Sequence, residues 1–312
     1  MRSLSLNNIF YVLLLLGLAL LCNGCPSIQS VRKVPKRTKP ELRYKGVAVS
    51  KWVERLDNPK RQERLVAAEA LLSMGMPIVP KLLWNFSHSK LRIRSGVARI
   101  VGILARKNRH LVPILIRASK HRVWVIRHAG SIALLWSRTR SPKAIKALIR
   151  AMNKRRQRIS YFAAAALYRS RVRTPAVRRA FFKAAYSKDW KTRGVALHAL
   201  AQIVPRRWRV HSALLAGLRH KHFELRMRAA FIIGELQPKV SSMMTYLEKA
   251  LEDTHPTVRL YVAEALIKHQ PKSHSAYMVL LQSFQSWNGQ LRSKARKVLK
   301  RLDRKAAQVL LK

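Results

Sequence analysis

The sequence predicts an all-α protein, a right-handed α-solenoid of about eight helical hairpins with a period of 33 residues. Two columns of residues recur with that period. In the second helix of each hairpin, small residues stand beside larger apolar ones at helical spacing. The composition agrees, because 48% of the 312 residues are hydrophobic and only 11 are Gly and 13 are Pro. A single hairpin cannot bury its apolar face, so we expect the hairpins to stack on a shared core.

The repeat is visible in an arginine column and in a leucine column. The first column contains Arg64, Arg94, Arg127, Ser160, Arg193, Arg226, Arg259 and Arg292, and the second contains Leu82, Leu115, Leu148, Phe181, Leu214, Leu247 and Leu280. The first arginine step is 30 residues, and every later step in both columns is 33. So many equal intervals indicate a true repeat, in which each unit is a helix A, a short turn and a helix B.

The N-terminal residues 1–24 are predicted to be a signal peptide. Arg2 precedes an apolar run from Ile9 to Leu21, which is shorter than the roughly 20 residues of a membrane-spanning helix. The small residues before Cys25 resemble a bacterial lipobox, in which the cysteine becomes the lipidated first residue of the mature chain. Cys22 stands where that pattern prefers Leu, so secretion without lipidation and a retained anchor stay as alternatives. The prediction is a membrane-anchored lipoprotein of the bacterial envelope, facing the periplasm or the exterior.

Residues 25–46 are predicted to form a basic tether with prolines, and residues 47–312 to form the repeat domain. Removal of residues 1–24 leaves Cys25 as the one cysteine, so no disulfide framework is available and packing must stabilise the domain. Pro142 and Pro175 are placed where a helix A begins and Pro256 where a helix B begins, positions that need no backbone N–H donor.

One segment carries a family pattern. Asp253 to Leu266 reads D-T-H-P-T-V-R-L-Y-V-A-E-A-L, which resembles the D-P-x-x-x-V-R-x-x-A-x-x-A-L pattern of HEAT repeats, in particular the short form of phycobilin-lyase-like proteins. The resemblance extends over about residues 50–305. It implies HEAT-like hairpins and says almost nothing about activity. The T-P-L-H and W-x-x-L-G patterns of ankyrin and tetratricopeptide repeats are missing from the sequence.

The turn before each arginine departs from this family pattern. In HEAT repeats the acid of the turn commonly pairs with the arginine ladder, but the column of Asp253 otherwise reads Asn58, His88, His121, Lys154, Ser187, His220 and Ser286. Arg94, Arg127 and Arg226 are therefore expected to lack that partner. They either cap carbonyl groups or form an electropositive ridge that accepts an external anion.

Aromatic residues occupy the position three residues before the arginine. Trp124, Trp190 and Phe223 are expected at the start of helix B, where they would stack on bases or sugars or would form a hydrophobic staple. The histidines at 88, 121 and 220 do not predict a metal site, because neighbouring hairpins lie about 8–10 Å apart while the ligands of one zinc lie within about 2.1 Å of it. They are interpreted as turn residues.

The charge predicts the class of partner. The chain has 64 Lys and Arg against 13 Asp and Glu, and the 119 residues between Glu69 and Asp189 contain no acid. Such a field attracts anionic polymers or acidic proteins. The predicted polyanion-binding residues are Arg94, Arg127, Lys154, Arg155, Arg156, Arg158, Arg193 and Arg226.

The sequence predicts no enzymatic activity and no cofactor. It contains no G-x-S-x-G, H-E-x-x-H or phosphate-loop pattern, and its central region has no carboxylate for acid–base catalysis. We therefore predict a non-enzymatic, basic envelope scaffold that binds an acidic protein or a surface polyanion along one face. The alternative is a nucleic-acid-binding HEAT-like protein, for which Asp189-Trp190 faintly resembles the alkyl-base DNA glycosylases.

Overall fold

The computed structural model describes residues 41–153, 157–236, 241–300 and 302, which form two compact units, Met1–Thr139 and Arg140–Lys312. The predicted signal peptide, Cys25 and most of the predicted tether lie outside the described residues, as do Lys154, Arg155 and Arg156. Arg158 lies in a described helix, but its side chain is not among the described ones.

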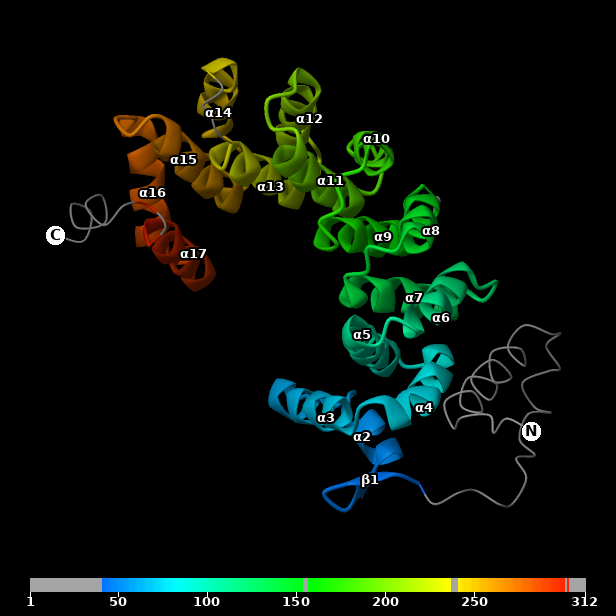
Figure 1. Ribbon diagram of the computed structural model, residues 1–312. Coiled ribbons are helices and arrows are strands. Elements are labelled where there is room, and N and C mark those ends of the chain that lie inside the picture. The colour runs from blue at the N-terminus through cyan, green and yellow to red at the C-terminus, as the bar shows by residue number, and fades with distance from the viewer. Residues whose placement is uncertain (1–40, 154–156, 237–240, 301, 303–312) are drawn as a thin grey trace, which may run out of the picture. The chain divides into compact units, whose positions relative to one another are not determined.

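Unit 1 begins with a small β-hairpin and continues with stacked helices. Its elements are β1 Arg43–Tyr44, β2 Val47–Ala48, α2 Val49–Arg55, α3 Arg61–Met74, η2 Met76–Ile78, α4 Val79–Trp84, η3 Asn85–Ser87, α5 Leu91–Lys107, α6 Leu111–Lys120 and α7 Trp124–Ser137. Figure 1 shows α3, α5 and α7 stacked on one another, with α4 and α6 on one side of this stack.

The β-hairpin corrects the end of the predicted tether. Arg43 pairs with Ala48, and the turn between the strands has positive φ at Lys45 (48°) and Gly46 (75°), as a tight hairpin turn requires. The indole N–H of Trp52 donates to the carbonyl of Tyr44 at 3.4 Å and ties the hairpin to α2. Residues 41–46 are therefore folded, and the expectation that the tether extends to residue 46 is wrong for them.

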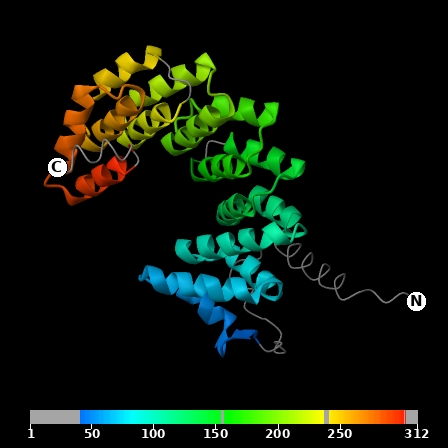
Figure 2. The same cartoon turned by 60° about the vertical axis from the view of Figure 1, so that its left-hand side comes forward.

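Unit 2 continues the alternation of A and B helices. Its elements are α8 Pro142–Met152, α9 Gln157–Arg169, α10 Pro175–Ala184, α11 Trp190–Ile203, α12 Trp208–Leu218, α13 Phe223–Gly234, η4 Ser241–Met243, α14 Met244–Ala250, α15 Pro256–His269, α16 His274–Gln285 and α17 Gly289–Leu299. Figures 1 and 2 show α10, α12 and α14 on one side and α11, α13 and α15 in a second row. The predicted all-α repeat fold is confirmed.

The repeat columns form the core and the helix starts, as the sequence predicts. All seven members of the leucine column are at most 1% exposed. The B helices approach closely through glycine: a Cβ on Gly102 would lie 2.3 Å from the carbonyl oxygen of Ala133, and one on Gly234 would lie 2.9 Å from the Cα of Ala265. Small residues at these positions therefore set the spacing between consecutive B helices.

Prolines start three of the helices, as predicted: Pro142 begins α8, Pro175 begins α10 and Pro256 begins α15.

Within the described residues no single helix is long and apolar enough to cross a membrane. Only the pair Arg61–Met74 and Met76–Ser87, which is bent by 103°, has the length and composition of a possible span.

Candidate binding site in the turns between helices A and B

The column arginines hold the turns together. In each of six repeats the Nη1 group of the arginine donates to the carbonyl groups six and five residues earlier. The pairs are Arg64 with Asn58 and Pro59, Arg94 with His88 and Ser89, Arg127 with His121 and Arg122, Arg226 with His220 and Lys221, Arg259 with Asp253 and Thr254, and Arg292 with Ser286 and Trp287.

These contacts have a physical cause in the geometry of the hairpin. Helix A ends at the turn and leaves carbonyl groups without partners inside the helix, and its dipole places negative charge there. A guanidinium group from the first turn of helix B donates to carbonyl groups of the turn, just beyond the end of helix A, and is placed close to that negative charge. Arg94 is 3% exposed and Arg127 is 9% exposed, so both are structural parts of their turns. The carbonyl-capping interpretation is confirmed for these two residues.

The variable turn column has one shared role. Each of its seven described side chains accepts a hydrogen bond from the backbone N–H two residues later, at 2.8–3.2 Å. The donors are the residues that directly precede each helix B. The acceptors are Asn58, His88, His121, Ser187, His220, Asp253 and Ser286. Any short side chain with an acceptor satisfies this requirement, which explains why the acid is replaceable.

The histidines of the column are therefore turn residues, as predicted. His88, His121 and His220 each use Nδ1 as the acceptor, which requires the neutral ring. Burial lowers the pKa of His220, and the nearby cation of Arg193 lowers it further, so both favour the neutral form. Within the described residues, no group of three or more His, Cys, Asp or Glu side chains is arranged to hold a metal ion.

Arg226 corrects a second expectation. Its Nε donates to Oδ2 of Asp253 at 2.6 Å and its Nη2 donates to Oδ1 at 2.8 Å, a bidentate ion pair with the turn of the next repeat. Both side chains are largely buried, at 14% and 9% exposure. Burial opposes ionisation of Asp253, but hydrogen bonds from Arg226 and from the backbone of His255 outweigh it and hold the pKa of Asp253 below its usual value. The expectation that Arg226 lacks an acidic partner is wrong, because the partner comes from the following repeat.

Arg193 occupies the same column one repeat earlier, and its surroundings differ. The residue equivalent to Asp253 there is His220. Among the described residues the Nε atom of Arg193 is shielded from solvent and has no hydrogen-bond partner, and burial lowers the pKa of this guanidinium. Asp189, the nearest acid along the chain, accepts from the backbone N–H of Thr192 at 3.0 Å and caps α11. Its carboxylate is not a partner of Nε of Arg193, which has none among the described residues.

The predicted aromatic residues begin helix B, as expected, and stack between repeats. The ring of Phe223 lies parallel to that of His255 at 3.7 Å, and the ring of Trp190 lies 5.7 Å from that of His222. The guanidinium of Arg94 lies 5.5 Å from the ring of Trp124. A hydrophobic staple residue precedes the helix cap, whereas these residues are the first of their helices, so the staple interpretation is wrong.

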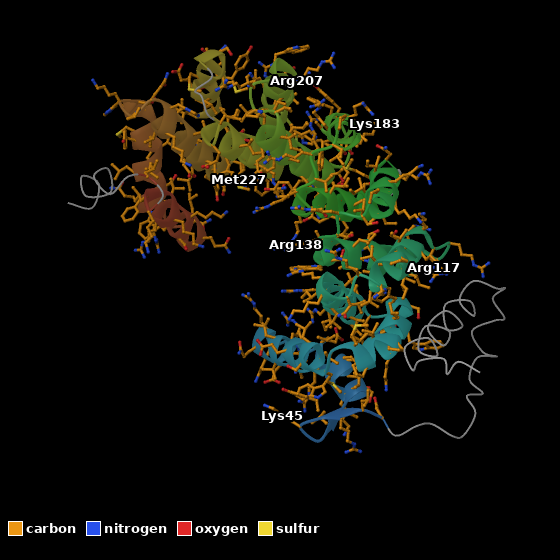
Figure 3. The ribbon with its side chains drawn as sticks, viewed as in Figure 1. Lys45, Arg117, Arg138, Lys183, Arg207 and Met227 are labelled. Atoms are coloured by element: carbon orange, nitrogen blue, oxygen red, sulfur yellow. The ribbon has the colours of Figure 1, made fainter. Side chains whose placement is uncertain are left out.

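Some exposed aromatic residues were missed by the sequence reasoning. Trp208 is 70% exposed at the start of α12, beside Arg207 and Arg209, and Trp287 is 98% exposed in the turn before α17. Figure 3 shows Arg207 on the side of α12 that points away from the α13 helix, where Met227 lies. The run Arg206-Arg207-Trp208-Arg209 was the available signal, since a tryptophan among arginines rarely enters a core.

Comparison with known proteins agrees with this architecture. Residues 212–300, from α12 to α17, match the HEAT repeat family. Two solved structures show the same fold: YibA of E. coli, with TM-score 0.52 and 17% identity over 81% of this chain and 92% of that one, and Kap121p bound to Nup53p, with TM-score 0.57 and 15% identity over 81% of this chain and 33% of that one. A search among curated proteins gave no significant match.

These findings define the class of protein, an all-α repeat protein of stacked helical hairpins. Residues 212–300 match HEAT repeats, in agreement with the motif at Asp253. The CpcE–CpcF complex of phycocyanin lyase from Nostoc sp. PCC7120 also matches, with 18% identity over 80% of this chain and 97% of that one, but its TM-score is 0.39 and nothing about activity follows from it.

Proposed function

We propose that this protein is a non-enzymatic, basic scaffold that binds an acidic protein partner through the surface of its hairpins. The observation that carries the proposal is the imbalance of charge, 64 Lys and Arg against 13 Asp and Glu. Several described acids already pair with cations of the chain itself: Glu41 with Lys81, Asp57 with Lys90, Asp253 with Arg226, and Glu235 and Glu264 with Lys268. The remaining cations are expected to attract a negatively charged partner.

An acidic protein is preferred over a nucleic acid because of the fold. Kap121p has been solved with a protein bound to it, and an array of this fold offers an extended surface to a polypeptide. The exposed side chains of Trp208 and Trp287 supply apolar contacts of the kind that protein interfaces concentrate. Nucleic-acid binding remains the second candidate, supported by the same charge and by these tryptophans beside arginine.

The proposed location is the bacterial cell envelope, with Cys25 as the lipidated residue and residues 26–40 as a basic tether. The support is the sequence from Arg2 to Cys25, which lies outside the described residues. A tagged full-length chain and its Cys25→Ala variant, fractionated side by side, test the location. Membrane recovery that depends on Cys25 is expected, and cytosolic recovery of both forms contradicts it and favours the nucleic-acid alternative.

Binding is tested with the full chain and labelled probes of matched charge, poly-glutamate and single-stranded DNA, across a salt series. We expect poly-glutamate to bind, with an affinity that falls steeply as salt rises. A probe affinity that does not change with salt, or binding of DNA alone, would overturn the proposal. Lys143, an exposed residue at the start of α8 that is not among the predicted binding residues, offers a single-charge control in the variant Lys143→Gln.

A further inference from the structure

Two neighbouring repeats of unit 2 place an arginine in the same position but give it different partners. At Arg226 the Nε and Nη2 groups hold the carboxylate of Asp253 at 2.6 and 2.8 Å. At Arg193, which lies 33 residues earlier, Nε is buried and has no hydrogen-bond partner among the described residues. The following repeat therefore supplies a carboxylate to Arg226, while Nε of Arg193 receives no acceptor from the described residues.

His220 cannot replace the carboxylate, although it occupies the column of Asp253. Its Nδ1 atom accepts from the backbone N–H of His222 at 3.1 Å, as Oδ1 of Asp253 accepts from His255. The neutral ring that does this carries its proton on Nε2, which is a donor and cannot accept from a guanidinium. Asp253 caps its turn and pairs with an arginine, whereas His220 only caps its turn.

The position is costly to leave without an acceptor. A buried donor without a partner destabilises the folded state, and does so more strongly when the donor is charged. Arg193 as a whole is only partly buried, but its Nε is shielded from solvent, so a ligand from outside the chain would bind at the terminal nitrogens. Lys191 and Lys221 are exposed beside it and Trp190 stacks near His222, so the surroundings are cationic and aromatic.

We propose that Arg193 binds the carboxylate of an Asp or Glu side chain from an acidic partner segment through its terminal nitrogens, so that the partner has the role that Asp253 has for Arg226. This inference rests on the proposed function and names the residue that binds the carboxylate of the partner. A carboxylate fits better than a phosphate because the internal example is a carboxylate, with two oxygens in the plane of the guanidinium.

The test uses His220→Asp, which supplies the missing carboxylate from within the chain. We expect this variant to melt at a higher temperature than the wild type and to bind labelled poly-glutamate about tenfold more weakly, since Arg193 is then occupied. Arg193→Gln is expected to weaken binding by a similar factor without the gain in melting temperature. Lys143→Gln removes the same unit of net charge at a distant site and is expected to change binding less than twofold.

The outcomes separate this inference from the proposed function. If poly-glutamate binds the wild type and both Arg193→Gln and His220→Asp bind it as Lys143→Gln does, the inference is overturned and the basic scaffold stands. If poly-glutamate does not bind the wild type at all, both are overturned. Should the two variants lose affinity for single-stranded DNA and keep it for poly-glutamate, the ligand of Arg193 is a phosphate and the carboxylate assignment is overturned.

Discussion

The turn that contains Asp253 and the turn that contains His220 are built on the same plan, yet they differ in what they supply to the arginine of the preceding repeat. Both cap the start of helix B through a side-chain acceptor, at 2.8 Å for Asp253 and 3.1 Å for His220. Only the first also supplies a bidentate partner, to Arg226. The comparison shows that capping and charge pairing are separable, so a repeat can keep its fold while its arginine becomes available to a ligand.

The largest effect is expected from Asp253→Ala, which removes both roles at once. The variant leaves the guanidinium of Arg226 largely buried without its carboxylate and removes the acceptor for the backbone of His255. The free energy of unfolding should fall by about 2–4 kcal/mol. Urea denaturation monitored by circular dichroism measures it, with Glu252→Ala as the control, because Glu252 is an exposed acid next to Asp253. Equal losses in the two variants would mean that general charge, not the ion pair, stabilises this turn.

The opposite change, His220→Asp, is expected to stabilise the protein by about 1 kcal/mol, because it gives Arg193 an acceptor without removing the cap. A double-mutant cycle with Arg193→Gln isolates the new pair. The gain should disappear in the double variant. If His220→Asp stabilises the chain equally when Arg193 is absent, the added acid acts on the surrounding cations in general and the two turns are not equivalent.

The sequence predicted the parts of this site that depend on local periodicity. The column of Trp124, Trp190 and Phe223 marks the first residues of α7, α11 and α13, because the polar turn and the start of an apolar pattern fix a helix boundary. The leucine column is buried for the same reason.

The partner of Arg226 could not be predicted from the sequence. Asp253 lies 27 residues after it and only six before Arg259, and the motif does not show which arginine faces the carboxylate. That choice depends on how one hairpin stacks on the next. Similarly, the sequence does not show that Nδ1 of His220 accepts the hydrogen bond that an aspartate oxygen accepts at the start of helix B.

The stability contributed by the two turns should depend on pH in different ranges. The pKa of His220 in the folded protein lies below its usual value of 6.5, through burial and through Arg193, His222, Lys221 and Arg226. The stability that neutral His220 contributes is therefore complete above pH 6.5 and is lost as the pH falls through the folded pKa. Asp253, whose pKa lies below its usual 3.8, keeps its contribution above pH 3.8 and loses it at lower pH.

The variant His220→Asn isolates this titration, because Asn58 shows that asparagine makes the same cap. Thermal melting should place the variant near the wild type at about pH 7.5 and above it at about pH 5.5, because below pH 6.5 the unfolded wild-type chain takes up a proton at His220 that the folded protein disfavours. His198 and His255, whose pKa values are also lowered, are present in both proteins, so a difference in melting temperature between them reports on His220. Parallel melting curves for the two proteins at both pH values would remove His220 as the cause of acid sensitivity.

The smallest expected effect concerns the aromatic contacts beside the two turns. Phe223 lies parallel to His255 at 3.7 Å, while Trp190 is tilted by 32° against His222 at 5.7 Å. Double-mutant cycles of Phe223→Leu with His255→Asn, and of Trp190→Leu with His222→Asn, should give coupling energies of about 1 and about 0.5 kcal/mol. A stronger coupling at Trp190 would show that its ring is held for stability. A weak one leaves the ring of Trp190 available to the partner that Arg193 binds.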